Sequence, residues 1–160
     1  MEIYILRHAI AEPRRPGRPD AERKLTPDGK AKLGNVLARA RATKVAPARI
    51  LTSPLVRALE TAEIAAQALE CPNKIVRTDA LLPGASPRDV WREICARKNE
   101  AALMLAGHEP MLSATVAYLL GTPSLVLDFK KGALVRLDCD RFDGPPHATL
   151  KWILTPALAG

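Results

Sequence analysis

The most constraining feature of this sequence is an uninterrupted apolar run, Ile3 to Leu6, that stops abruptly at Arg7 and His8. Its residues are bulky or β-branched, a pattern that predicts a strand buried on both faces of a parallel sheet. Ligands of open α/β sheets bind beyond the carboxyl ends of the strands. The run therefore predicts a strand that delivers His8 to a site. A core strand that merely ends at His8, with Arg7 paired to a carboxylate, gives the same local pattern.

Two further strands are expected to end in polar residues that precede a proline. Residues 48–52 form a short strand that stops at Ser53, with Arg57 shortly after it. Residues 101–106 form a second fully apolar strand, followed closely by His108. If the strands are parallel, their carboxyl ends meet at one edge of the sheet. The sequence then predicts a site with two histidines and two arginines, approached by the amino termini of two helices.

The rest of the chain supplies the other elements of an α/β fold. Thr26 and Pro27 are typical of a helix start, and Ser86 with Asp89 predicts a capping box. We expect a three-layer domain over residues 1–160, with a mostly parallel central sheet flanked by helices. The other expected strands are residues 74–78 (at a sheet edge), 133–138 and 149–154, and the expected helices are residues 27–41, 54–69 (capped by Ser53), 87–97 and 110–120.

Composition bounds the class of protein and its compartment. The chain has 160 residues, the size of one domain, and its net charge of +7 is concentrated between Arg14 and Arg49. That charge suits a polyanion, a phosphorylated substrate or solubility alone. The three cysteines, Cys71, Cys95 and Cys139, form no CxxC pair, so we expect reduced thiols in the cytoplasm. No apolar run is long enough to span a bilayer, and we expect no membrane partner.

The predicted cluster has the chemistry of a phosphoryl site. Two histidines and two arginines make it cationic and rich in hydrogen-bond donors, as a phosphoryl group requires. His8 and His108 have no carboxylate or cysteine at a spacing typical of metal ligands, and the chain has no Gly-rich P-loop. We therefore expect neither a metal nor another cofactor. Metal-free phosphoryl transfer with histidine as nucleophile is the reaction that remains.

Three stretches of the sequence resemble the signature blocks of a known family. They are Leu6–Ala9, Thr52–Thr61 and Ala106–Pro110, and together they are similar to the histidine phosphatase superfamily, also called the phosphoglycerate-mutase-like fold. The short length, Leu25–Gly29 and the closing Trp152–Pro156 resemble its SixA-type phosphohistidine phosphatase branch. The commonest first block of the family has glycine after the histidine, where this chain has alanine, which the SixA-like branch tolerates.

The resemblance implies a role for each matched residue. His8 is the nucleophile that attacks phosphorus and becomes a phosphohistidine, which water then hydrolyses. Arg7 and Arg57 bind the phosphoryl oxygens, and His108 gives them a hydrogen bond or charge. Arginine suits this role because its planar fork stays charged and binds phosphate bidentately. Ser53 either adds a hydroxyl to the phosphoryl site or only caps its helix.

The general acid is not identified by any spacing in the sequence. Larger members of the superfamily use a carboxylate to protonate the leaving oxygen, and Glu12, Asp20, Glu22 and Glu109 are candidates here, with Asp20 and Glu109 preferred. Each of them also fits a solvated loop charge or a helix cap. A phosphorylated imidazole can leave without a dedicated acid if its ring is protonated, so the missing acid favours a phosphohistidine substrate.

Three functions follow from these observations. The first is a cytosolic phosphatase that acts on phosphohistidine in a protein. The second keeps the mechanism but acts on a small phosphomonoester or phosphoanhydride metabolite. The third is a non-catalytic module that holds a polyanion through the basic loop Glu12 to Lys24, with Arg14, Arg15 and Arg18 as contacts. We expect a phosphorylated partner and no nucleic-acid partner.

Overall fold

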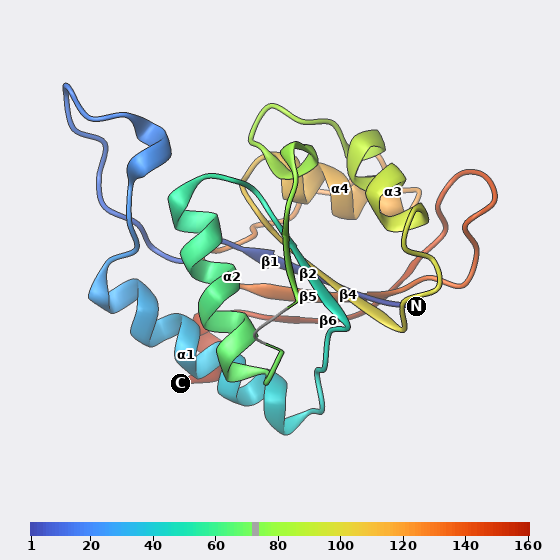
Figure 1. The fold of residues 1–160 in the computed structure, drawn as a ribbon. Helices are drawn as coiled ribbons and strands as arrows, with labels where there is room; N and C mark the ends of the chain where they lie inside the picture. Colours follow the sequence, from blue (N-terminus) through green and yellow to red (C-terminus); the bar gives the residue numbers. More distant parts are fainter. Residues whose placement is uncertain (72–73) are drawn as a thin grey trace.

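The computed structural model describes residues 1–71 and 74–160, and this part of the chain contains a sheet of six strands. The strands are β1 (Glu2–Arg7), β2 (Arg49–Thr52), β3 (Ile75–Arg77), β4 (Ala102–Gly107), β5 (Leu134–Asp138) and β6 (Thr149–Leu154). Their order across the sheet is β3-β2-β4-β1-β5-β6 (Figure 1). The first four in this order are parallel, and β5 and β6 each pair antiparallel with their preceding neighbour.

Helices cover both faces of this sheet. One face carries α1 (Pro27–Ala42), α2 (Val56–Ala68) and the short α5 (Pro156–Ala159), and the other carries α3 (Pro87–Cys95) and α4 (Met111–Leu119) (Figure 1). Two single turns of 3-10 helix, η1 (Asp20–Glu22) and η2 (Asp79–Leu81), lie in the connections. Among the described residues, no helix has both the length and the apolar character needed to cross a membrane. The expected three-layer, mostly parallel α/β fold is confirmed.

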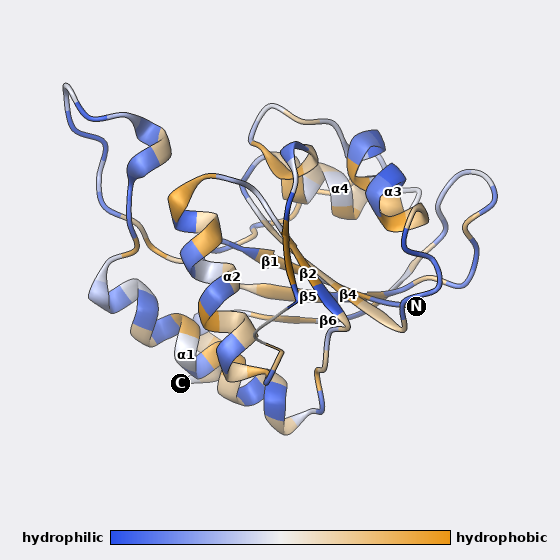
Figure 2. Cartoon of the chain, in the orientation of Figure 1, coloured by the Kyte–Doolittle hydropathy of each residue, from blue (hydrophilic) through white to orange (hydrophobic). Residues whose placement is uncertain are grey.

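Strand β1 lies in the middle of the sheet and contributes side chains to the hydrophobic core on both faces. Ile3 and Ile5 face the layer of α3 and α4, whereas Tyr4 and Leu6 face α1 and α2. All four are at most 1% exposed. In Figure 2 the central strands are largely hydrophobic, whereas the loop that follows β1 is largely hydrophilic. The apolar run is therefore a strand buried on both faces, as predicted.

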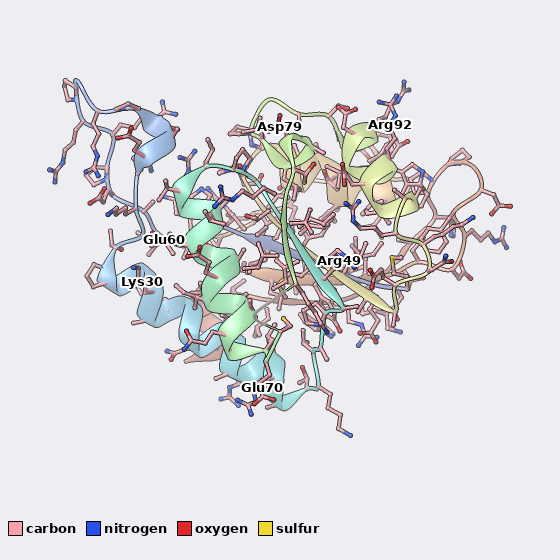
Figure 3. All side chains as sticks on the ribbon, viewed as in Figure 1. Lys30, Arg49, Glu60, Glu70, Asp79 and Arg92 are labelled. Atoms are coloured by element: carbon pink, nitrogen blue, oxygen red, sulfur yellow. The ribbon has the colours of Figure 1, made fainter. Side chains whose placement is uncertain are left out.

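The start of α1 is fixed against the chain that leaves β1. A Cβ atom at Gly29 would lie 2.2 Å from the Ile10 carbonyl oxygen, so glycine alone fits this approach. Glu60 of α2 accepts a hydrogen bond from the Leu25 N–H at 2.6 Å and pairs with Lys30 of α1 at 3.5 Å. Figure 3 shows Lys30 and Glu60 on these neighbouring helices. These contacts hold the carboxyl end of the loop Glu12 to Lys24 near α2.

The caps at the helix starts agree with two of the sequence predictions and differ from a third. Thr26 caps α1 by accepting from the Gly29 N–H at 3.0 Å, and Ser86 with Asp89 forms the predicted capping box of α3. The predicted cap of α2 was wrong, because that helix begins at Val56 and is preceded by Leu55 without a side-chain cap. The Ser53 hydroxyl instead contacts the ring of His108, the residue that follows β4, and the Leu55 N–H. The other helix ends differ from the predictions by no more than two residues.

Candidate active site

The site lies where β1, β2 and β4 end. These strands are adjacent and parallel, and the register pairs Arg7 with Gly107 at the last residues of β1 and β4. The residues that follow the three strands are His8, Ser53 and His108, so they meet at one edge of the sheet. The rings of the two histidines lie 5.0 Å apart between centroids. The structure thus brings together the strand-end residues that the sequence analysis selected.

The backbone fixes which nitrogen of His8 is free to react. Its Nδ1 atom lies 2.8 Å from the Ala9 carbonyl oxygen, and because a carbonyl can only accept, Nδ1 carries the proton. The lone pair is then on Nε2. Thr61 holds this turn, since its hydroxyl accepts from the Ala9 N–H at 3.1 Å and donates to the Arg57 carbonyl at 2.7 Å. The burial of the ring lowers the pKa of His8 to about 4, so the imidazole is uncharged at neutral pH.

Ser53 fixes the second histidine in the same manner. Its hydroxyl oxygen accepts from the Leu55 N–H at 3.3 Å and lies 2.9 Å from Nε2 of His108. Among the described residues, His108 is the acceptor available to the Ser53 O–H, which places the His108 proton on Nδ1. Burial, followed by repulsion from His8, lowers the pKa of His108 to about 3. His108 is therefore an uncharged donor whose Nδ1–H is unused.

Arg57 is buried and Arg7 is half-buried beside the histidines, and backbone oxygens hold both side chains. Arg57 is 5% exposed and donates from its two terminal nitrogens to the Asp20 carbonyl at 2.9 Å and the Asp20 carboxylate at 3.0 Å. Arg7 donates from a terminal nitrogen to the Phe129 carbonyl. Burial lowers the pKa of both guanidinium groups from their ordinary value. These contacts fix the guanidinium planes while leaving other N–H groups free.

Three buried donor atoms have no partner among the described residues. They are Nε of Arg7, Nε of Arg57 and Nδ1 of His108, all from the strand-end cluster around His8. A buried polar group without a hydrogen bond costs about 1–3 kcal/mol. One tetrahedral oxyanion has enough acceptor oxygens to satisfy all three donors at once. The arrangement suits a phosphoryl group that lies next to the free Nε2 of His8.

The carboxylates near the site are already engaged. Asp20 has its pKa lowered to about 2, first by the hydrogen bond from Arg23 and then by the charge of Arg57, so it is ionised at neutral pH. Such a group has no proton to donate. Glu109 accepts from the Ser113 N–H at 3.0 Å and the Ser113 hydroxyl at 2.7 Å, and thereby caps the first turn of α4. In the free protein the Asp20 carboxylate is thus bound by arginines and Glu109 by Ser113, and a role of either as general acid stays a prediction.

The basic loop Glu12 to Lys24 projects from the body of the fold beside the site (Figure 1). Several of its charges pair within the loop: Arg18 lies 3.1 Å from Glu12, and Arg14 lies 3.0 Å from Asp20. Glu22 is exposed. The loop therefore contributes structure, through the bond of Asp20 to Arg57, as well as charge.

Some residues at the site were not identified by the sequence analysis. Arg23 bonds to Asp20, Phe129 supplies the carbonyl that holds Arg7, and Lys131 acts electrostatically on His8. Positive charge is the only signal in the sequence for Arg23 and Lys131. Within the described part of the chain, no group of three or more His, Cys, Asp or Glu side chains is placed to hold a metal ion.

Comparison with known proteins identifies the family. The sequence model of the histidine phosphatase superfamily (branch 1) matches residues 3–81, which include the first two strand-end blocks. An uncharacterised protein of Picosynechococcus sp. is 34% identical over 144 residues, which cover 86% of this chain and 84% of that protein. The structure of the protein histidine phosphatase SixA complexed with tungstate has a TM-score of 0.86 and 25% identity, with 98% of each chain covered. The chain belongs to the histidine phosphatase superfamily.

This histidine phosphatase is of the SixA type. An Agrobacterium tumefaciens protein assigned as a phosphohistidine phosphatase SixA has a TM-score of 0.82 and 27% identity, with 97% of each chain covered. These likenesses confirm the expected phosphoglycerate-mutase-like fold and identify the chain as a phosphatase. More distant structures, such as the α-ribazole phosphatase from Shigella flexneri at 17% identity, share the fold alone.

Proposed function

We propose that this histidine phosphatase removes the phosphoryl group from phosphohistidine in a protein, through a phosphoenzyme on His8. The observation that carries the proposal is the set of three unpartnered buried donors beside the free Nε2 of His8. Arg7, Arg57 and His108 supply these donors. A phosphoryl group in this position would give each donor an oxygen and would present phosphorus to the nucleophile.

The reaction proceeds in two displacements. Nε2 of His8 attacks phosphorus, so that a new N–P bond forms while the P–N bond to the substrate imidazole breaks. The leaving imidazole takes the bond electrons and is uncharged if its ring was protonated beforehand. Water then attacks the phosphorus on His8, the N–P bond breaks, and inorganic phosphate leaves. Arg7 and Arg57 balance the charge on the phosphoryl oxygens during both steps.

The state of the carboxylates supports phosphohistidine over an ordinary ester. An alkoxide leaving group needs a proton from a general acid, whereas Asp20 is ionised and Glu109 is bound to Ser113. A protonated imidazole leaves without that help. The SixA-type neighbours also favour a phosphohistidine substrate. A small phosphorylated metabolite is the alternative, because fold neighbours include an α-ribazole phosphatase.

The first test is phosphate release from a phosphohistidine-containing protein in the presence of EDTA. Wild type is compared with His8→Ala, and with His147→Ala as a matched control because His147 is an exposed histidine away from the strand ends. We expect turnover in wild type and His147→Ala and none in His8→Ala. Loss of turnover on chelation, or retention of it in His8→Ala, contradicts the mechanism.

The substrate class is decided by a second substrate in the same assay. p-Nitrophenyl phosphate has a good leaving group and reports the chemistry without a protein partner. Faster turnover of the phosphoprotein supports the proposal. Turnover of small esters alone assigns the enzyme to phosphorylated metabolites.

The cytoplasmic location expected from the free thiols of Cys71, Cys95 and Cys139 stays a prediction.

A further inference from the structure

A β-turn of residues Lys130 to Ala133 lies against the end of β1. The turn is closed by the Ala133 N–H, which donates to the Lys130 carbonyl at 3.0 Å. Gly132 has a φ of 75°, as the third residue of a type II turn requires. Its N–H donates to the carbonyls of Arg7 and His8, each at 3.2 Å. The turn is thus bound directly to the backbone that carries the nucleophile.

Lys131 stands at the corner of this turn, among the cations of the site. Its pKa is lowered first by partial burial and then by the charges of Arg7, Arg23 and Arg57. Lys131 in turn contributes to the lowered pKa of His8. The described residues offer Lys131 no ion pair or side-chain hydrogen bond, whereas the neighbouring lysine has a carboxylate partner. An ammonium group that feels the charges of nearby guanidinium groups is relieved of repulsion when an anion binds.

We propose that Lys131 is a substrate-binding residue whose ammonium group binds the phosphoryl oxygens of the substrate on the solvent side of the site. The proposal deepens the function proposed above and rests on it for the identity of the substrate. Lys131 is exposed, so it meets the phosphoryl group from the solvent side while Arg7 and Arg57 bind it from within. A flexible ammonium suits this position because it can follow the group as it enters.

The adjacent lysine gives the experiment a matched control. Lys130 pairs with Asp128 at 2.7 Å, and its side chain is 63% exposed. Lys131→Gln and Lys130→Gln therefore remove the same charge one residue apart.

We would measure the Kd of tungstate and of inorganic phosphate by calorimetry for wild type, both variants and Lys131→Arg. We expect about tenfold weaker binding in Lys131→Gln, the loss of one charged hydrogen bond, and recovery in Lys131→Arg. Lys130→Gln should bind within about twofold of wild type, because its charge is exposed and screened.

Anion binding separates this inference from the proposed function, because it needs no turnover. If wild type hydrolyses phosphohistidine and both lysine variants bind phosphate equally, the role of Lys131 is overturned and the proposed function stands. If no substrate is hydrolysed and Lys131→Gln alone weakens tungstate binding, the proposed function fails and the anion contact of Lys131 stands. In an active enzyme, Lys131→Gln should raise KM for the phosphoprotein while kcat is retained, and an unfolding midpoint equal to that of wild type excludes a structural cause.

Discussion

At the scale of single residues, one hydrogen bond decides the reactivity of each histidine. The Ala9 carbonyl holds the proton of His8 on Nδ1, and the Ser53 hydroxyl holds that of His108 on Nδ1 as well. His8 thereby presents a lone pair and His108 presents a proton. Two chemically identical side chains, with ring centroids 5.0 Å apart, thus acquire opposite roles from their neighbours.

Ser53→Ala tests the second of these bonds. Without the hydroxyl, His108 can carry its proton on either nitrogen, and the donor to the phosphoryl group is no longer fixed. We expect kcat/KM to fall about tenfold, the equivalent of one charge-assisted hydrogen bond. Ser53→Thr, which keeps the hydroxyl, is the control, with the unfolding midpoint of each variant measured alongside. Full activity in Ser53→Ala would show that His108 needs no such support.

The lowered pKa values of the two histidines make stability depend on pH. The unfolded chain protonates His8 and His108 near pH 6.5, whereas burial keeps both uncharged in the folded chain until about pH 4 and about pH 3. The contribution of the two uncharged histidines to the free energy of unfolding is therefore fully present above pH 6.5 and is lost as the pH falls toward 4. Between pH 7 and 5.5, the free energy of unfolding should fall by about 1 kcal/mol for each histidine. Urea titrations of wild type and of a His8→Asn, His108→Asn double variant measure the difference, and equal pH dependence in both refutes it.

At the scale of elements, local patterns were predictable and long-range contacts were not. The buried strand β1, the cap of α1 and the capping box of α3 depend on residues close in sequence. Ser53 lies before a proline and predicts a helix cap, whereas its partner in the structure is His108, 55 residues away in the sequence. The contact of Arg57 with Asp20 spans 37 residues, and no spacing rule relates them. The strand ends were enough to select the residues proposed to react, whereas the residues that hold them in place could be found only in the folded chain.

Asp20→Asn tests how the loop Glu12 to Lys24 supports α2. If Asp20 only positions Arg57, the variant keeps the backbone carbonyl bond and should lose less than about tenfold in kcat/KM. That loss should be equal for p-nitrophenyl phosphate and for a phosphomonoester with a poor leaving group. A general acid contributes about 100-fold or more, mostly for poor leaving groups. A large loss confined to the poor leaving group would therefore restore Asp20 as the proton donor.

At the scale of the whole molecule, the net charge of +7 should guide anionic substrates to the strand ends. Raising NaCl from 0.05 to 0.5 M should lower kcat/KM for an acidic phosphoprotein about tenfold and leave kcat nearly unchanged. An Arg14→Gln, Arg15→Gln, Arg18→Gln variant should show a weaker dependence. Binding of a phosphate-free polyanion that equals substrate binding and survives His8→Ala would instead favour a module that only holds polyanions.

The central position of β1 has a consequence for how the chain reaches its native state. Strand β1 pairs with β4 and β5, whose residues lie about a hundred or more positions later in the sequence. Pairing over such separations is slow, because a long loop must close before any contact compensates for the lost entropy. Until β5 has been synthesised, β1 has an open edge of apolar residues, which is a template for aggregation. The surroundings of His8, the proposed nucleophile, are thus complete only after β4 and β5 have been synthesised.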